Sequence, residues 1–213
     1  MTDIVIKVGI SPPPILEEDP RALLYHSRND MVDEVKDTKE ARLRGWRRMT
    51  LFGLIFFPSG IAVKGVIETF RLLQEVTPEA TKLGEGTVPI NGGLYPWSWP
   101  RSEEKNFKAL SGGLLVAPIL SELILNREPQ RVTEWVEAVS KWSFRRIIPC
   151  HFENDIKADG KQFKSALQFL DKKARVAGAV DKRKVQVEAA DLSLLRKVSD
   201  VFTVLGIVAA KEI

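Results

Sequence analysis

Apolar residues recur at the three- and four-residue spacing of an α-helix in several parts of the chain. The pattern is clear after Pro129, which suits the first helical position, in Val132, Val136 and Val139. This stretch predicts a helix over residues 129–141. The same spacing predicts further helices in the following segments: from residue 39 to about 57, 67–76, about 163–170 and 191–205.

Short polar residues stand where several of these helices begin, and they are the residue types that cap free backbone N–H groups. We expect Asp37 or Thr38 to cap the helix that starts near residue 39. Asp159 is expected near the start of the helix around 163–170, and Asp191 at the N-cap of the last helix. Gly206 stands just past that helix, where glycine often ends one.

Dense β-branched residues predict strands at residues 2–8 and 145–149. In the apolar run 113–125, Pro118 is expected to divide a short strand from a helix. The prolines and acidic residues of 12–20 predict an extended, non-helical linker.

The order of elements predicts an α/β (α+β) fold, with a partial sheet packed against helices. A chain of 213 residues is long enough for one good core, so we expect a single domain over 1–213. Its predicted parts are a strand and Pro-rich connector (1–36), a helical segment (37–76), a loop region rich in Gly, Pro and Trp (77–112) and a C-terminal α/β lobe (113–213).

The charge of the chain narrows the class of binding partner, and its cysteine content narrows the cellular compartment. The net charge of +4 arises from 32 basic and 28 acidic residues that are interspersed, so we expect no nucleic-acid binding. The one cysteine, Cys150, excludes an intrachain disulfide and fits a reducing compartment such as the cytosol or plastid stroma. The N-terminus lacks the pattern of a secretory signal, and its strand-like first residues suggest part of something longer.

Arginines and aromatic residues gather in 42–63 beside an uncharged apolar run, which is too short to span a bilayer. One interpretation is a buried core helix, and the pattern favours it. The other is a basic and aromatic collar that lies on a membrane or against a membrane protein. Its contact residues would be Arg44, Trp46, Arg47, Arg48, Phe52, Phe56 and Phe57.

A second aromatic cluster lies between prolines at 95–100. Tyr95, Trp97 and Trp99 would form either a loop packed over a small core or a docking surface for a partner. The sequence favours neither interpretation.

The stretch Trp142–Asp159 carries the strongest functional signal. An apolar strand runs through Pro149 into Cys150 and His151, and α/β folds collect functional side chains just past strand ends.

Several strings of the chain resemble a known family, the domain of unknown function 4336 (DUF4336) of plants, algae and cyanobacteria. The family is usually plastid-located in eukaryotes, has no settled activity, and is itself similar to the metallo-β-lactamase fold. The resemblance rests on five strings: residues 20–28, 45–54, 115–120, 134–136 and 144–152.

The resemblance implies that Asp3 and His151 match two metal-ligand positions of the second half of a metallo-β-lactamase-like chain. The His-rich ligand loop of the first half is absent, and the chain has only two histidines. His26, the other histidine, lies in a connector with no supporting spacing. A catalytic zinc needs about three protein ligands, so we predict no cofactor beyond a vestigial zinc or iron site.

These observations favour a non-catalytic protein over an enzyme. The concrete version is a structural or interaction subunit in the plastid, on the stromal side or associated with the thylakoid. It would contact other protein subunits as a peripheral part of a photosystem-type complex, without a transmembrane helix. The alternative is a metal-dependent hydrolase or oxidoreductase whose remaining ligands come from a missing N-terminal segment or from a partner.

Overall fold

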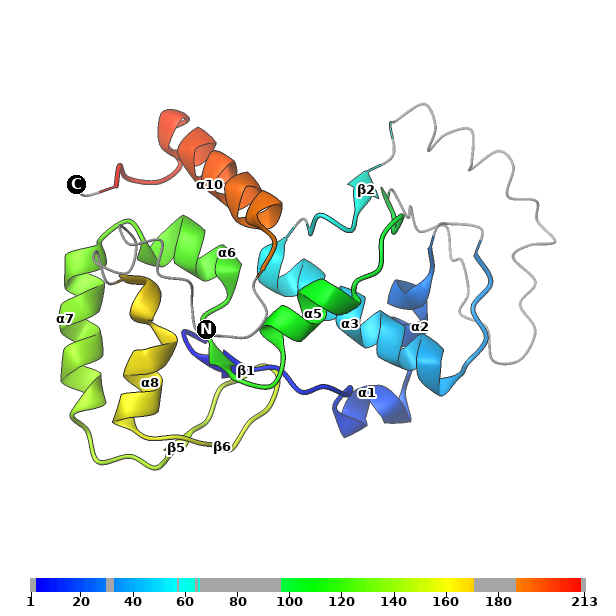
Figure 1. The fold of residues 1–213 in the computed structure, drawn as a ribbon, viewed down its shortest axis with the longest axis horizontal. Coiled ribbons are helices and arrows are strands. Elements are labelled where there is room, and N and C mark those ends of the chain that lie inside the picture. The colour runs from blue at the N-terminus through cyan, green and yellow to red at the C-terminus, as the bar shows by residue number, and fades with distance from the viewer. Residues whose placement is uncertain are drawn as a thin grey trace. The chain divides into compact units, whose positions relative to one another are not determined.

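The computed structural model describes residues 3–29, 33–56, 58–63, 65, 97–170 and 187–211. The chain divides into two compact units, and each is described by itself (Figure 1). The first unit comprises Met1–Ile10, Leu54–Phe56 and Lys108–Ile213, and the second comprises Ser11–Gly53 and Phe57–Phe107. The described residues form helices and small two-stranded sheets, so the mixed α+β class is confirmed. The single domain over 1–213 stays a prediction.

The second unit begins with two short helices, α1 (Pro14–Glu18) and α2 (Arg21–Ser27). The prediction of an extended linker over 12–20 is therefore wrong. Pro14 occupies the first turn of α1, and Pro20 is the N-cap of α2. Proline loses no intrahelical hydrogen bond at these positions, and its fixed φ already suits the first turn, so proline can start a helix here.

Helix α3 (Lys39–Ile55) follows, close to its predicted bounds. The Thr38 hydroxyl caps it by accepting a hydrogen bond from the backbone N–H of Ala41 at 3.1 Å. The Arg42 guanidinium reaches back to the Asp37 carboxylate at 2.6 and 2.7 Å. Of the two candidate caps, Thr38 therefore fills the position, and Asp37 binds a first-turn arginine instead.

Helices α2 and α3 approach closely at Gly45. A Cβ atom on Gly45 would lie 1.8 Å from the carbonyl oxygen of Leu23, well inside any allowed contact. The absent side chain is therefore what lets the backbone of α2 touch α3.

We expect Gly45→Ala to lower the free energy of unfolding by about 1–3 kcal/mol, because the two helices must move apart. Gly113→Ala is the matched control, since a Cβ there meets nothing within 4 Å. Urea denaturation measures both variants. Equal stability of the two would show that the close approach costs nothing to disturb.

The rest of the second unit is built around one antiparallel ladder. Strand β2 (Ala62–Val63) pairs with β3 (Trp97–Ser98), and α5 (Glu104–Leu110) begins shortly afterwards. The helix predicted over 67–76 and most of the Gly-rich loop that follows it lie outside the described residues.

In the first unit, β1 (Ile6–Lys7) pairs antiparallel with β4 (Leu114–Leu115). Pro118 separates β4 from α6 (Pro118–Leu120), as predicted. Helix α6 widens into a π-helical turn, η1 (Ser121–Leu125), in which the N–H of Asn126 donates to the carbonyl of Ser121 at 3.2 Å.

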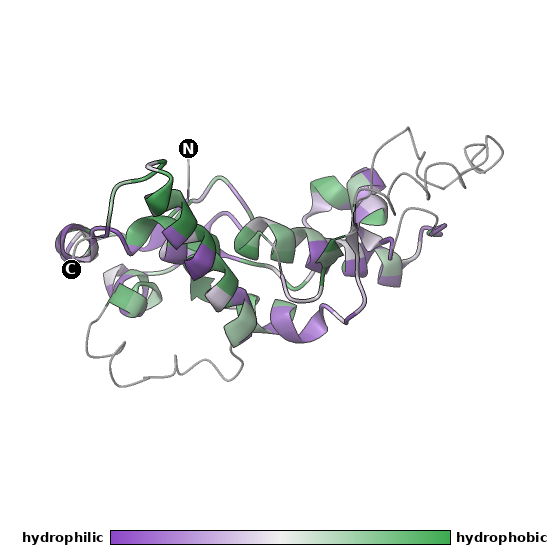
Figure 2. Ribbon diagram, turned by 90° about the horizontal axis from the view of Figure 1, so that it is seen from above, coloured by the Kyte–Doolittle hydropathy of each residue, from purple (hydrophilic) through white to green (hydrophobic). Residues whose placement is uncertain are grey.

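Helices α7 (Pro129–Ser140) and α8 (Gly160–Ala166) lie side by side in the first unit (Figure 1). Their apolar faces meet in a core that includes Val136 and Phe163, and η2 (Gln168–Leu170) extends this core. Figure 2 shows helices that carry both hydrophobic and hydrophilic residues, as helices packed on one side against a core do. The predicted cap is confirmed, because Asp159 forms a reciprocal capping box with Gln162.

Between α7 and α8 the chain forms a hairpin of β5 (Arg146–Ile147) and β6 (Ile156–Lys157). The first strand was predicted, and the second was not. A two-residue strand carries too little periodicity to be recognised without its partner.

Helix α10 (Ala189–Val204) closes the described chain. The prediction that Asp191 is its N-cap is wrong: Glu188 is the N-cap, and Asp191 is buried in the first turn. Gly206, with φ of 69°, ends the helix as predicted. Buried Arg127 holds α10 by donating to the carbonyls of Ser199 and Ala209.

Candidate functional site

The loop after β5 lies against the start of the chain, and Asp3 joins the two. The Asp3 carboxylate accepts hydrogen bonds from the backbone N–H of Cys150 at 2.8 Å and of His151 at 2.9 Å. The same carboxylate lies 2.7 Å from Nδ1 of the His151 ring. The structure therefore brings Asp3 and His151 together across 148 residues of sequence.

Two further contacts fasten the loop to β1. The N–H of Glu153 donates to the carbonyl of Lys7 at 3.0 Å, and the Lys7 ammonium lies 2.6 Å from the Glu153 carboxylate. Phe152 and Asp155 have φ of 66° and 60°, a region that non-glycine residues seldom occupy. The surrounding contacts hold the loop in this costly conformation.

The electrostatics of Asp3 follow from its surroundings. Its side chain is only 10% exposed, whereas that of His151 is 64% exposed. Burial by itself raises the pKa of Asp3, but the hydrogen bonds from the Cys150 N–H, the His151 ring and the His151 N–H together outweigh it. The pKa of Asp3 is therefore lowered below its ordinary 3.8, and the carboxylate is ionised at neutral pH.

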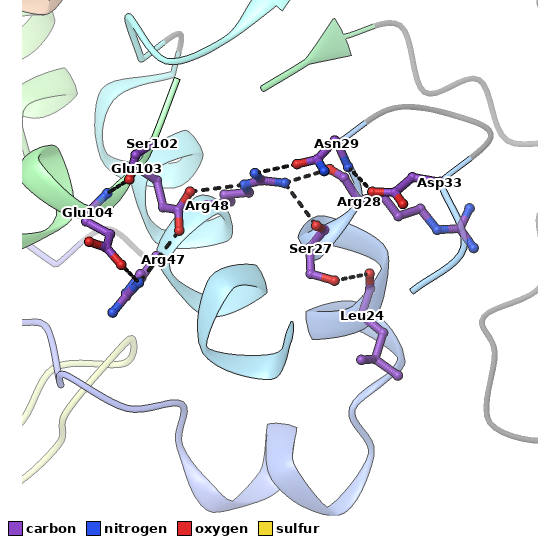
Figure 3. A network of polar contacts seen from close by, with 10 residues as sticks. All are labelled: Leu24, Ser27, Arg28, Asn29, Asp33, Arg47, Arg48, Ser102, Glu103 and Glu104. Carbon is purple, nitrogen blue, oxygen red and sulfur yellow. Dashed lines mark hydrogen bonds and ion pairs between the residues drawn. The ribbon is translucent and has the colours of Figure 1, made fainter. Parts of the chain in front are cut away.

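A second polar cluster lies in the second unit, where Arg48 of α3 is buried (Figure 3). Its guanidinium donates to the backbone carbonyls of Ser27 at 2.9 Å and Arg28 at 2.7 Å. It also donates to the Asn29 side chain at 2.8 Å and forms an ion pair with Glu103 at 3.4 Å. One arginine from α3 thus ties together the end of α2 and the start of α5.

Aromatic rings surround this cluster. The Arg48 guanidinium lies 5.0 Å from the centre of the Trp99 ring, within range of a cation–π interaction. The Phe52 and Trp97 rings stack at 5.5 Å between their centres. These contacts are internal to the second unit.

Residues 1–169 match the family model described as Domain of unknown function (DUF4336). The chain belongs to this family. No curated protein matches the DUF4336 chain, and no solved structure does. The similarity to metallo-β-lactamases and the plant, algal and cyanobacterial distribution stay predictions.

In the DUF4336 chain the structure brings together the two ligand positions that the resemblance implies, Asp3 and His151. Each Asp3 oxygen accepts an N–H group of the loop, which uses one of its two lone pairs. The ring of His151 presents Nδ1 to Asp3 as well. Among the described residues, no group of three His, Cys, Asp or Glu is placed to hold a metal ion. What the pair does fit is a carboxylate that fixes a loop and orients an imidazole.

His26 lies in α2, in the second unit, and does not join this site. Burial lowers its pKa, and its ring meets the Tyr25 ring edge-on at 5.4 Å between centres. His26 therefore has a local packing contact within α2.

The predicted partner-binding residues are placed unevenly in the DUF4336 chain. Trp46, Arg48 and Trp99 are buried, so they do not form an exposed docking surface. Arg44, Arg47, Phe52 and Trp97 are half-buried, and Phe56 is exposed. Phe57 and Tyr95 lie outside the described residues. In the described part of the chain, no helix is both long and apolar enough to cross a membrane.

The burial of Arg48 has a simple cause. Its guanidinium reaches from α3 to the end of α2 and to Glu103, and Glu103 and Asn29 supply the charge and polarity that a buried guanidinium needs. Sequence reasoning missed Glu103 and Asn29. They lie 55 and 19 residues from Arg48, and no spacing rule connects them.

Proposed function

We propose that this DUF4336 chain is a non-catalytic interaction subunit whose fold derives from the metallo-β-lactamase type. In the concrete form of the proposal, it works in a plastid as a peripheral component of a thylakoid photosynthetic complex. The observation that carries the non-catalytic part is the use of Asp3. Its carboxylate is occupied by two backbone N–H groups and the His151 ring.

An Asp that served a reactive metal would have to direct a lone pair at it, and the three contacts of Asp3 use three of the four lone pairs of its carboxylate. Asp3 instead spends its hydrogen-bonding capacity on fixing the loop after β5, and the Lys7–Glu153 pair fixes the same loop again. A loop held this firmly suits the presentation of a surface to another molecule. The interaction role is supported further by large apolar side chains that stand exposed, including Phe56 and Trp142.

The first test is metal analysis of the purified chain produced with zinc and iron in the medium. We expect less than stoichiometric metal, and no change in the content on His151→Ala. Stoichiometric zinc or iron that disappears with His151→Ala would contradict the proposal and support the metal-dependent hydrolase or oxidoreductase.

The second test addresses the partner. Gentle fractionation of plastid membranes should recover the protein in a membrane complex, and affinity purification should recover other subunits with it. A protein that is entirely soluble and monomeric after such fractionation would contradict the subunit role.

A further inference from the structure

Four cations cluster around the β5–β6 hairpin of the first unit: Lys141, Arg145, Lys157 and Lys161. All four are exposed, and within the described part of the chain none of them is in an ion pair. In the described ranges, four exposed cations without an opposite charge beside them give this part of the surface a local excess of positive charge.

Backbone contacts bring these cations together. The carbonyl of Ser140, at the end of α7, approaches Gly160, at the start of α8, so closely that a Cβ on the glycine would lie 1.9 Å from it. Lys141 and Lys161 are the residues that follow these two. On the hairpin, the N–H of Ala158 donates to the carbonyl of Arg145 at 3.2 Å, so Arg145 lies across from Ala158, the residue that follows Lys157.

The hairpin keeps like charges face to face. Arg146 and Lys157 are directly opposed in the antiparallel register, an arrangement that destabilises a pair of strands. Arg146 is neutralised by Asp155 at 2.5 Å, but Lys157 has no such partner among the described residues. The fold therefore retains a repulsive arrangement on its surface.

The acidic groups of this region are already engaged. Asp159 caps α8, Glu153 pairs with Lys7, and Glu137 pairs with Lys164. Glu134 remains as an exposed acid on α7, where it lines a groove between α7 and α8. One carboxylate against four cations leaves a positive surface.

Two large apolar side chains are exposed in the same stretch. Trp142 is 66% exposed and directly follows Lys141, and Ile148 is 72% exposed directly after β5. Tryptophan and aliphatic side chains flanked by lysine and arginine are the combination found where proteins lie in the headgroup layer of a bilayer. An acidic protein partner would satisfy the same cations, and the experiment below separates it from a bilayer.

We propose that these six residues (Lys141, Trp142, Arg145, Ile148, Lys157 and Lys161), here called the cationic face, bind the surface of a bilayer that carries anionic headgroups. The proposal rests on the proposed function for its membrane setting, and it moves the membrane contact from α3, where much of it was predicted, to the β5–β6 hairpin. Each cation near an anionic surface contributes about fivefold in affinity, and the apolar pair adds to this.

The test is co-sedimentation with vesicles, using the whole chain. Vesicles of phosphatidylcholine alone are compared with vesicles that also contain phosphatidylglycerol. We expect binding to the anionic vesicles only, and binding that weakens as salt is added. The double variant Arg145→Glu/Lys157→Glu should reduce the partition coefficient by about 25-fold or more, since two attractions become repulsions.

The matched control is Lys36→Glu/Lys39→Glu, which changes the net charge equally at two exposed cations of the second unit. It should bind as the unaltered chain does. Misfolding is not expected of the test variant, because Glu at 157 would stand opposite Arg146 and replace repulsion with attraction. Trp142→Ser should weaken binding without changing its dependence on salt.

Equal binding of the test and control variants, or equal binding to neutral vesicles, would overturn the proposal. So would binding to soluble polyglutamate with none to anionic vesicles, because the face would then be a site for acidic protein. Failure of the metal analysis would leave these vesicle results unchanged, so the two proposals fail separately.

Discussion

Replacement of Arg48 by methionine is expected to lower the free energy of unfolding by about 3–5 kcal/mol. The Arg48 side chain is 4% exposed and that of its partner Glu103 is 7% exposed. Methionine fills much of the same volume but leaves the Glu103 carboxylate without its nearest positive charge. The carbonyls of Ser27 and Arg28 also lose their donor. Urea denaturation monitored by tryptophan fluorescence measures the change.

Two further variants separate the buried charge from the loss of packing. The double variant Arg48→Met/Glu103→Gln should recover part of the loss, because no unpaired charge then stays buried. Arg131→Ala is the control, since Arg131 is 74% exposed and pairs with Glu128, which is 48% exposed. It should cost about 1 kcal/mol or less. A loss for Arg48→Met no larger than that of the control would show that the cluster adds little stability.

We expect Asp3→Asn to lower the free energy of unfolding by about 2–3 kcal/mol at neutral pH, with the largest effect on the loop after β5. The amide keeps the size of the carboxylate, but its NH₂ group would face one of the N–H donors of Cys150 or His151. The charge that strengthened these bonds is lost as well. Thermal or urea denaturation measures the total change, and hydrogen exchange of the Cys150 and His151 amides locates it.

The effect of Asp3→Asn should depend on pH with a definite sign. The pKa of Asp3 is lower in the folded chain than its ordinary 3.8, so the carboxylate contributes stability that is complete above 3.8. That contribution is lost as the pH falls through the folded value, and the unaltered chain and the variant should converge there. Asp19→Asn, at an exposed ion pair, is the control and should leave the unfolding midpoint nearly unchanged. A difference that stays constant down to strongly acidic pH would contradict the assignment.

The helices with strong periodicity could be predicted from sequence, and the caps could be predicted in part. Helices α7 and α8 lie close to their expected positions because both bury one apolar face against a common core. The helices in 12–20 were not predicted because proline can either break a helix or occupy its first turn. The prediction took only the helix-breaking effect into account. Asp191 was predicted as a cap because aspartate is common both at the N-cap and in the first turn of a helix. The residue type alone does not separate these two positions.

The candidate site, like the fold, could be predicted from the sequence only in part. The meeting of Asp3 with His151 was expected only through the resemblance, since no local rule joins residues so far apart. What the carboxylate does there could not be predicted, because it depends on two backbone N–H groups that have no signature in the side chains. The burial of Trp46 and Arg48 agrees with the core-helix interpretation that the sequence favoured, but the partners that allow Arg48 to be buried, Glu103 and Asn29, could not be predicted.

The π-helical turn Ser121–Leu125 sets the angular position of the residues that directly follow it, among them Arg127. It holds one residue more than a regular turn, so deleting a single residue within it would restore the α-helical repeat and rotate the next segment by about 100°. Arg127, two residues further on, would then point away from the Ser199 and Ala209 carbonyls that it now binds. The anchoring of α10 thus depends on a phase offset of one residue, and a chain that lost this residue would need another way to hold its last helix.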